Sequence, residues 1–338
     1  MKILKYPQVL NSSFDPITSF MSDVKSLFLH QQEENMGSYL YSTPDPSIKG
    51  DTVNGEEYYR EIINQSQDYY LYQEEMQLIH QVAHKMAVHV PKEANIIEFG
   101  TGTETSVINK TLPFLKAIKQ VQNYIPIDLC KTYLHQTEEI VTRELPEILI
   151  KPLEEDFIKN VDLVKNFSTP VVFFKGSTIT NLSPSICIDF LERISQALQP
   201  EGILIVGVDA NQNESSLRKA YNTEGGAKFA LNIFHLINRE LPITNFNPTA
   251  FKYDFEWVIG EHCVKHNAIS TQAQNFVLDQ VSINIKPGEK FHLFSSYKYP
   301  IEYFQSIAKK GGLEPLDCFI HENKRMVIHV LKPQQLHK

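Results

Sequence analysis

Short apolar runs alternate with longer segments of helical periodicity between about residues 94 and 209. Strand-like runs occupy residues 96–99, 123–128, 147–153, 171–174 and 202–209. Apolar positions at helical spacing follow at 105–118, at 131–143 and after Ser183. Strands and helices that alternate in this way predict an α/β fold with a doubly wound, mostly parallel sheet.

The rest of the chain does not continue this alternation. Before the first strand, helical patterns occur at 17–29, 55–67 and 73–89. After residue 209, two helices precede several β-leaning segments, around Tyr221, 229–240, Trp257, Phe276 and Phe291. A helix and a closing hairpin are expected at the end, at 303–310, 316–319 and 326–331. These patterns predict an N-terminal segment (1–75), a sheet-bearing domain (76–209 with 297–338) and an inserted second lobe (210–296).

The composition argues against several classes of protein. A net charge of −8 over 338 residues provides no basic surface for a phosphate backbone, so we expect no nucleic-acid partner. The four cysteines lie far apart without a C-x-x-C pair, and His80 and His84 have no acidic residue between them, so we expect no metal. No apolar stretch approaches the ~18 residues of a membrane helix. A soluble, cytoplasmic protein with no membrane partner is expected.

A turn with two glycines follows the first strand, in the sequence Glu98-Phe-Gly-Thr-Gly-Thr103. Glycine lets a ligand approach the backbone closely because no Cβ intervenes. A nicotinamide-binding turn requires a third small residue, and that position holds Thr105. The acid near the strand end, Glu98, instead fits the turn that holds S-adenosylmethionine in methyltransferases.

Further acids lie near the ends of the next two strands. Asp128 ends the second strand, where a carboxylate can accept from both ribose hydroxyls of a nucleotide. It could equally cap the helix that starts near Lys131, and both interpretations stay open. Asp156 and Phe157 follow the third strand, and an acid beside an aromatic ring suits an adenine, which offers an amino group and an apolar face.

The segment Lys175-Gly-Ser-Thr-Ile-Thr-Asn-Leu-Ser-Pro184 resembles the GSTIGNLTP motif of the histidine-specific Nα-methyltransferases of ergothioneine biosynthesis. Other segments match motifs of that family in the same order along the chain. They are 68–70 (E-Y-Y), 97–103 (VELGSGT), 124–128 (Y-x-P-x-D), 155–157 (G-D-F), 204–209 (LLxGxD), 220–221 (AY), 237–241 (NREL) and 296–299 (S-x-K-[FY]). The resemblance covers about residues 55–315. It implies a Rossmann-like class I methyltransferase core that uses S-adenosylmethionine.

The resemblance also implies roles for individual residues. Asn181 and Tyr69 would bind the α-amino group of an amino-acid substrate, Tyr221 its carboxylate, and Ser296 an imidazole ring. Tyr41 is a further substrate-binding candidate, in a segment that otherwise matches the family poorly. The cofactor would be held by Gly100, Gly102, Asp128, Asp156, Phe157 and Gly176. The substrate lobe would combine the N-terminal segment with the insertion.

Three positions depart from the family pattern. The family has a glutamate two residues before the serine that contacts the imidazole, and this chain has Phe294 there. A carboxylate discriminates a ring that bears an N–H, so the apolar ring should weaken selectivity for histidine. Thr180 replaces the last glycine of GSTIG, and Ser106 replaces the lysine that follows the glycine turn. The expected substrate is therefore histidine, or an aromatic or less polar amine.

Two other functions stay open at the level of the sequence. A nicotinamide-dependent oxidoreductase would share the strand–turn–helix unit, although Thr105 and the lack of a catalytic histidine pair argue against it. A catalytically silent relative would bind a metabolite or a protein through the inserted lobe. Retention of Gly100, Asp128, Asp156 and Asn181 argues against a silent copy.

Overall fold

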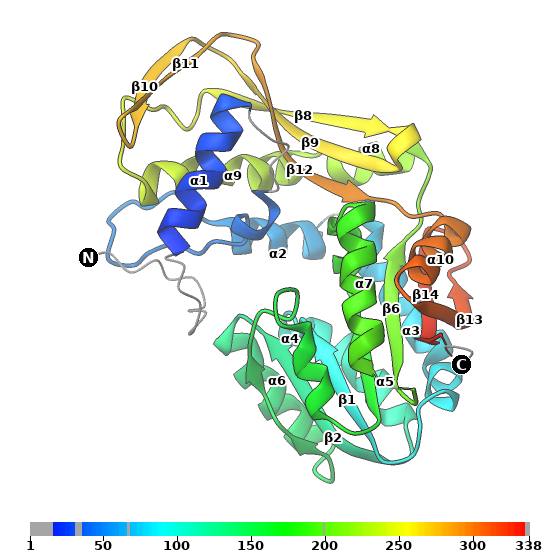
Figure 1. The fold of residues 1–338 in the computed structure, drawn as a ribbon. Coiled ribbons are helices and arrows are strands. Elements are labelled where there is room, and N and C mark those ends of the chain that lie inside the picture. The colour runs from blue at the N-terminus through cyan, green and yellow to red at the C-terminus, as the bar shows by residue number, and fades with distance from the viewer. Residues whose placement is uncertain (1–15, 31–35, 66–67, 199, 335–338) are drawn as a thin grey trace. The chain divides into compact units, whose positions relative to one another are not determined.

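A computed structural model describes residues 16–30, 36–65, 68–198 and 200–334 (Figure 1). These residues form two compact units, and each is described by itself. The sheet unit comprises the described parts of 71–212 and 297–338, and the lobe comprises those of 1–70 and 213–296. Within the described ranges, no helix has both the length and the apolar composition of a membrane span.

Eight strands of the described chain form the sheet of the sheet unit. Their order is β13-β14-β6-β5-β1-β2-β3. The short strand β4 also pairs with β2, further along that strand than β3 does. The strands are β1 Ala94–Phe99, β2 Val121–Asp128, β3 Leu149–Ile150, β4 Leu153–Glu154, β5 Pro170–Phe174, β6 Ile203–Asp209, β13 Leu313–Ile320 and β14 Met326–Pro333. Pairing is parallel from β6 to β3, whereas β14 is antiparallel to both of its neighbours. The predicted doubly wound α/β class is confirmed, with its switch of winding direction between β1 and β5.

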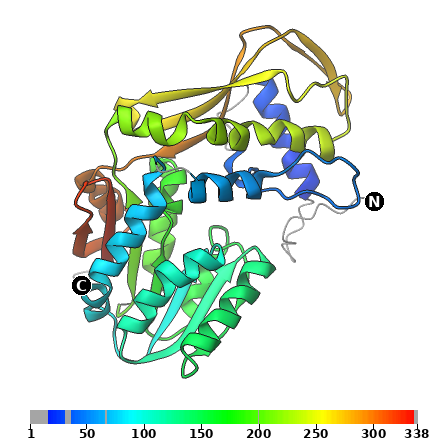
Figure 2. The same ribbon diagram turned by 180° about the vertical axis from the view of Figure 1, so that it is seen from behind.

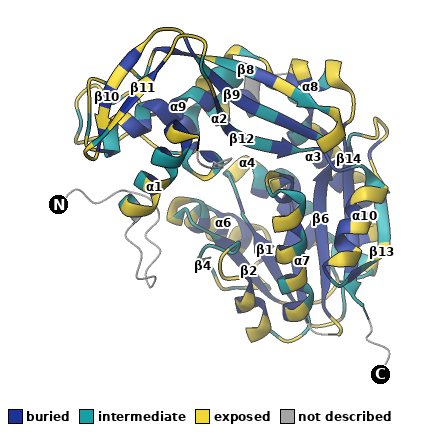
Figure 3. Ribbon diagram, turned by 45° about the horizontal axis from the view of Figure 1, so that its top comes forward, coloured by how far each residue is buried: buried dark blue, intermediate teal, exposed yellow. Residues whose placement is uncertain are grey.

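The central strands bury side chains on both faces, because successive residues of a strand point to opposite sides of the sheet. On one face, Ile97 and Phe99 pack in a cluster with η3 (Val161–Asn166), α7 (Pro184–Leu198) and α10 (Ile301–Lys310). On the other face, Ile96 packs in a cluster with α3 (Tyr70–Val88), α5 (Leu112–Ala117) and α6 (Lys131–Glu144). Figure 1 shows α7 in front of the sheet, Figure 2 shows α3 and α6 from behind, and Figure 3 shows β6 buried along its length.

The helical segment predicted at 105–118 contains a π turn. It forms α4 (Glu104–Ser106), the π turn η2 (Val107–Thr111) and α5, and the N–H of Leu112 reaches back to the carbonyl of Val107. Pro113 cannot donate a helical hydrogen bond to the carbonyl of Asn109, and His80 Nε2 lies 2.9 Å from that oxygen. His80 is thus a surface donor to backbone. No group of three or more metal-ligating side chains gathers in the described residues.

The strand predicted at 147–153 is wrong in its extent. Only β3 and β4, of two residues each, pair with β2 in this segment. Pro126 in β2 and Pro152 between β3 and β4 explain the interruption, since neither has the N–H that a strand ladder needs. The other predicted strands and helices that fall on described residues are confirmed, with boundaries shifted by a few residues.

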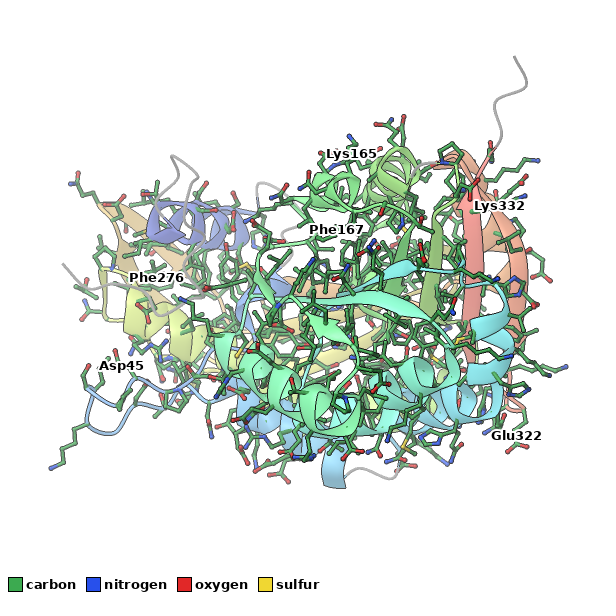
Figure 4. All side chains as sticks on the ribbon, turned by 90° about the horizontal axis from the view of Figure 1, so that it is seen from below. Asp45, Lys165, Phe167, Phe276, Glu322 and Lys332 are labelled. Atoms are coloured by element: carbon green, nitrogen blue, oxygen red, sulfur yellow. The ribbon has the colours of Figure 1, made fainter. Side chains whose placement is uncertain are left out.

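The lobe combines helices with two small sheets. Among its described residues the sheet orders are β12-β9-β8 and β11-β10-β7. Its elements are α1 Pro16–Leu29, η1 Met36–Tyr39, α2 Gly55–Gln65, α8 Glu214–Tyr221, α9 Glu224–Glu240, β7 Ile243–Thr244, β8 Phe251–Val258, η5 Ile259–Glu261, β9 Cys263–Ser270, β10 Gln274–Leu278, β11 Val281–Ile285 and β12 Lys290–Tyr297. Phe234 stacks on Phe251 with ring centroids 3.8 Å apart. Phe276, labelled in Figure 4, meets Phe28 edge to face at 5.1 Å.

Candidate functional site

The turn between β1 and α4 holds its two glycines in left-handed backbone conformations. The φ angle is +73° at Gly100 and +66° at Gly102, a region that residues with a side chain rarely adopt. The N–H of Gly100 donates to the carbonyl of Ile127 in β2 at 2.9 Å, which joins the turn to the neighbouring strand. Both predicted cofactor-binding glycines therefore have a conformational reason to be glycine.

Asp128, at the end of β2, is hydrogen-bonded to the same turn. Its Oδ2 accepts from Thr101 Oγ1 and from the N–H of Gly102, each at 3.3 Å. Its Oδ1 accepts from the N–H of Cys130 at 2.9 Å. Cys130, not Asp128, is the N-cap residue of α6, and no side chain caps that helix. Because each carboxylate oxygen has two lone pairs, Oδ1 can still accept from a ligand hydroxyl.

Asp156 and Phe157 lie in the turn after β4. Asp156 Oδ1 accepts from two backbone N–H groups of the residues that follow, at 3.1 and 3.2 Å. The ring of Phe157 stacks on Phe99 of β1, with centroids 4.8 Å apart and an interplanar angle of 11°. A Cβ placed on Gly100 would lie 3.7 Å from Phe157 Cε1. The aromatic ring is therefore a direct neighbour of the glycine turn.

A second glycine turn follows β5. Gly176 has a φ of +82°, and its N–H donates to both carboxylate oxygens of Glu75, at 2.7 and 2.9 Å. Thr180 is buried, and its hydroxyl donates to the carbonyl of Ser177 at 2.7 Å. The turn thus accommodates a threonine at the position of the family's glycine through an internal hydrogen bond. Asn181 is the exposed last residue of η4 (Thr178–Asn181).

Glu98 is fully buried beneath the first glycine turn and is not exposed to a ligand. Its Oε1 accepts from Thr111 Oγ1 at 2.8 Å and lies 2.7 Å from Lys175 Nζ, and its Oε2 accepts from the hydroxyl of Tyr124. Burial, together with the nearby Glu98 carboxylate, raises the pKa of Tyr124 well above its usual value, so this phenol remains a donor. The acid therefore supports the turn from inside the protein.

Three of the substrate-binding candidates belong to one group of aromatic residues in the lobe. The rings of Tyr69 and Tyr221 meet edge to face with centroids 5.8 Å apart. Tyr221 meets the imidazole of His266 edge to face at 5.5 Å, and that imidazole stacks on Phe294 at 4.1 Å. The hydroxyl of Tyr253 lies 2.7 Å from His266 Nδ1. These five residues are called the aromatic cluster below.

His266 and Tyr253 are not singled out by any sequence pattern. They lie on β9 and β8, and only the pairing of these strands brings them to Phe294 of β12. The available signal in the sequence is the alternation of apolar and polar positions along β9. That pattern predicts which side chains are buried, and it does not predict a binding site. Burial raises the pKa of Tyr69, with further contributions from Tyr59 and Tyr221, and also raises that of Tyr253. Both hydroxyls therefore stay protonated at neutral pH.

Tyr41 and Ser296 lie beside the aromatic cluster in the lobe. The ring of Tyr41 is 45% exposed and meets Tyr59 and Phe229 edge to face, at 5.0 and 5.2 Å. Tyr59 in turn is hydrogen-bonded to Tyr69. Ser296 is buried near the end of β12, two residues after Phe294.

The strand order and the glycine turn after β1 have the arrangement of a class I methyltransferase core. A family model described as histidine-specific methyltransferase, SAM-dependent, matches residues 20–333, and the chain belongs to this family. The residues present fit the family's cofactor. The glycines at positive φ permit close approach, Asp128 retains acceptor capacity, and Phe157 offers an aromatic ring beside them. The alternative of a nicotinamide-dependent oxidoreductase finds no support.

Relatives of the chain include named N-methyltransferases. The histidine N-alpha-methyltransferase of Mycolicibacterium smegmatis is 28% identical over 226 residues, which cover 64% of this chain and 68% of the relative. For the enzyme of that name from Mycobacterium tuberculosis, identity is 28% over 175 residues, or 50% of this chain and 53% of the relative. The 4-dimethylallyltryptophan N-methyltransferase of Arthroderma benhamiae is 25% identical over 285 residues, covering 78% of this chain and 82% of the relative. The protein is accordingly an S-adenosylmethionine-dependent N-methyltransferase.

Proposed function

We propose that the enzyme methylates the α-amino group of an amino acid whose aromatic side chain is less polar than imidazole. The observation that carries the proposal is the stack of Phe294 on His266, at 4.1 Å and with planes 8° apart. The family resemblance has a carboxylate at position 294, where it would select an N–H-bearing ring. A ring-lined surface favours aromatic side chains through offset or edge contacts.

The relatives support this substrate class. Enzymes named for 4-dimethylallyltryptophan, an indole amino acid, are 25% and 24% identical to the chain in Arthroderma benhamiae and Aspergillus fumigatus. Relatives of the chain thus include enzymes named for an indole amino acid as well as enzymes named for histidine. The family resemblance implies histidine as the substrate. The quantity to measure is therefore the enzyme's activity on histidine relative to its activity on other aromatic amino acids.

We assign the amine to Asn181 and Tyr69. Methyl transfer needs the amine unprotonated, with its lone pair aimed at the methyl group that the cofactor supplies from a positively charged sulfonium. The amide oxygen of Asn181 and the hydroxyl oxygen of Tyr69 can both accept hydrogen bonds from the N–H groups of the amine. The lone pair of the amine nitrogen then stays free. Because the raised pKa of Tyr69 keeps its proton in place, it positions the amine and does not act as a base.

The other candidate residues receive binding roles in the same proposal. Tyr221 would donate its hydroxyl to the substrate carboxylate, and Ser296, with Tyr41 at the outer edge, would contact the side chain. On the cofactor, Asp128 would accept from the ribose hydroxyls, while Asp156 and Phe157 would bind the adenine. The backbone of the turns at Gly100, Gly102 and Gly176 would contact the cofactor directly. In this scheme residues 1–75 and 210–296 supply the other substrate contacts, while 76–209 with 297–338 hold the cofactor and supply Asn181.

A product assay tests the proposal. The enzyme is incubated with S-adenosylmethionine and, separately, with histidine, phenylalanine, tyrosine and tryptophan, and methylated amino acids are quantified by mass spectrometry. We expect more methylated product from phenylalanine, tyrosine or tryptophan than from histidine. We also expect Tyr221→Phe to raise KM with little change in kcat. Tyr303→Phe, a partly exposed tyrosine of α10, is the matched control. Histidine as the preferred substrate by tenfold or more would contradict the proposed side-chain class.

A further inference from the structure

A buried lysine lies beneath the first glycine turn. Lys175 directly follows β5, is only 4% exposed, and reaches across to the end of the neighbouring strand β1. Its Nζ lies 2.7 Å from Glu98 Oε1, 2.7 Å from the carbonyl oxygen of Thr101, 3.1 Å from Ser106 Oγ and 3.2 Å from the carbonyl oxygen of Gly100. An ammonium has three N–H donors, so these four oxygens engage all of them.

One peptide group of the turn is held at both ends. The carbonyl of Thr101 accepts from Lys175 at 2.7 Å, and the N–H of Gly102 in the same peptide donates to Asp128 Oδ2 at 3.3 Å. A peptide is planar, so fixing its oxygen and its N–H fixes the orientation of the whole group. Glycines lose more conformational freedom on folding than other residues, and this turn has one on each side of Thr101.

We propose that Lys175 is a positioning residue of the cofactor site, which sets the conformation of the glycine turn from inside the protein. With its donors engaged, Lys175 acts through the turn and does not contact the cofactor. Ser106 stands where the resemblance has a lysine, and its hydroxyl is 3.1 Å from Lys175 Nζ. In this chain the positive charge beside the turn therefore comes from Lys175, at the end of the neighbouring strand β5. The inference concerns cofactor binding and does not depend on the identity of the amine.

A simpler explanation for Lys175 is that it only neutralises Glu98. Removing one partner of a buried pair is costly because the other charge is left unpaired. The double variant Lys175→Met/Glu98→Gln removes both charges, while the glutamine oxygen can still accept from Thr111 and its NH2 can donate to the hydroxyl oxygen of Tyr124. If the lysine only balanced charge, this variant should bind the cofactor normally. If the lysine positions the turn, the variant should bind the cofactor more weakly than the wild type although it is folded.

The test is a calorimetric titration of the double variant with S-adenosylhomocysteine, alongside its unfolding temperature without ligand. We expect a roughly tenfold or greater loss of affinity, the scale of lost hydrogen bonds to a charged group. The matched control is Lys298→Met/Asp209→Asn, which removes a fully buried ion pair of 2.9 Å elsewhere in the sheet unit. We expect the control to keep an affinity within about twofold of the wild type. Affinity within twofold in the folded Lys175→Met/Glu98→Gln variant would overturn the proposal.

A second variant decides the question if the double variant does not fold. Ser106→Ala removes one oxygen from Lys175 without changing any charge. We expect about a threefold loss of S-adenosylhomocysteine affinity and faster amide hydrogen exchange at residues 100–106 in the ligand-free protein. Unchanged affinity and unchanged exchange would contradict a positioning role for Lys175.

Discussion

The ring of Phe294 lies parallel to the imidazole of His266, with centroids 4.1 Å apart and an angle of 8° between the planes. The imidazole is 4% exposed and is also bonded at Nδ1 to the hydroxyl of Tyr253. A stacked pair of rings therefore occupies the position at which the family resemblance has a carboxylate. Because stacking selects shape and not N–H groups, this pair is the basis for the proposal of a side chain less polar than imidazole.

Phe294→Glu tests the specificity role of this position. A carboxylate beside a neutral imidazole can bind a substrate N–H, so we expect kcat/KM for histidine to rise by about tenfold relative to that for phenylalanine. The ratio of kcat/KM values for the two amino acids is the measurement. Phe294→Leu serves as the control, since it removes the ring without adding a charge. An unchanged ratio in Phe294→Glu would place position 294 outside the substrate site.

Asn181→Ala tests the amine-binding assignment. Loss of the amide oxygen should misalign the amine, so we expect turnover to fall by at least ~100-fold. The affinity for S-adenosylhomocysteine should stay within about twofold, because the assigned contact is with the substrate. Steady-state kinetics and calorimetry measure the two quantities. An equal loss of turnover and of cofactor affinity would move Asn181 to the cofactor.

Gly100→Ala tests the need for close backbone approach. Alanine at φ +73° costs about 1–2 kcal/mol of stability. Gly50→Ala introduces the same strain at φ +76° in a loop where no atom lies within 4 Å of the added Cβ. We expect similar losses of unfolding free energy in both variants, and a loss of S-adenosylhomocysteine affinity in Gly100→Ala alone. Normal affinity in Gly100→Ala would mean that no ligand approaches this glycine.

His329 gives the protein a stability that depends on pH. It is fully buried in β14, both ring nitrogens lack a hydrogen-bond partner among the described residues, and burial lowers its pKa to about 3. An unfolded histidine titrates near 6.5, so between these values the unfolded state binds the extra proton and stability falls as the pH decreases. From pH 7 to pH 5 this group alone should remove about 2 kcal/mol.

Urea unfolding at pH 7 and pH 5 measures this effect in the wild type and in His329→Leu. The variant should lose about 2 kcal/mol less than the wild type over this range. His84→Leu, at an exposed position of α3, should retain the wild-type dependence. The same pH dependence in His329→Leu as in the wild type would show that the histidine is already protonated or hydrated in the folded protein.

The sequence predicts those parts of the fold that depend on local pattern. The strand–turn–helix unit at Gly100 and the closing hairpin follow from period, glycine and turn residues within a short window. The strand at 147–153 is overextended because Pro152 and, on the partner strand, Pro126 interrupt the ladder, and Pro126 lies outside that window. The π turn likewise depends on the combined effect of Pro113 and His80, which are far apart in sequence.

The site residues missed by the sequence are those that act through distant partners. Lys175 matters because it reaches Thr101, 74 positions away, and His266 because strand pairing sets it against Phe294. Nothing in the neighbouring residues of either one indicates that contact. The position of Glu98 at a strand end predicts a cofactor-binding turn, but its partners Tyr124 and Thr111 show that it supports the turn from the buried side.

Calorimetry of the ternary complex tests the cofactor site and the proposed substrate class together. The enzyme is titrated with S-adenosylhomocysteine, and the saturated complex is then titrated with histidine, phenylalanine, tyrosine and tryptophan in turn. We expect S-adenosylhomocysteine to bind, and at least one of phenylalanine, tyrosine and tryptophan then to bind more tightly than histidine. We also expect weaker amino-acid binding when S-adenosylhomocysteine is omitted. Binding of S-adenosylhomocysteine without a response to any amino acid would contradict the proposed substrate class, and no binding of S-adenosylhomocysteine would contradict the cofactor site itself.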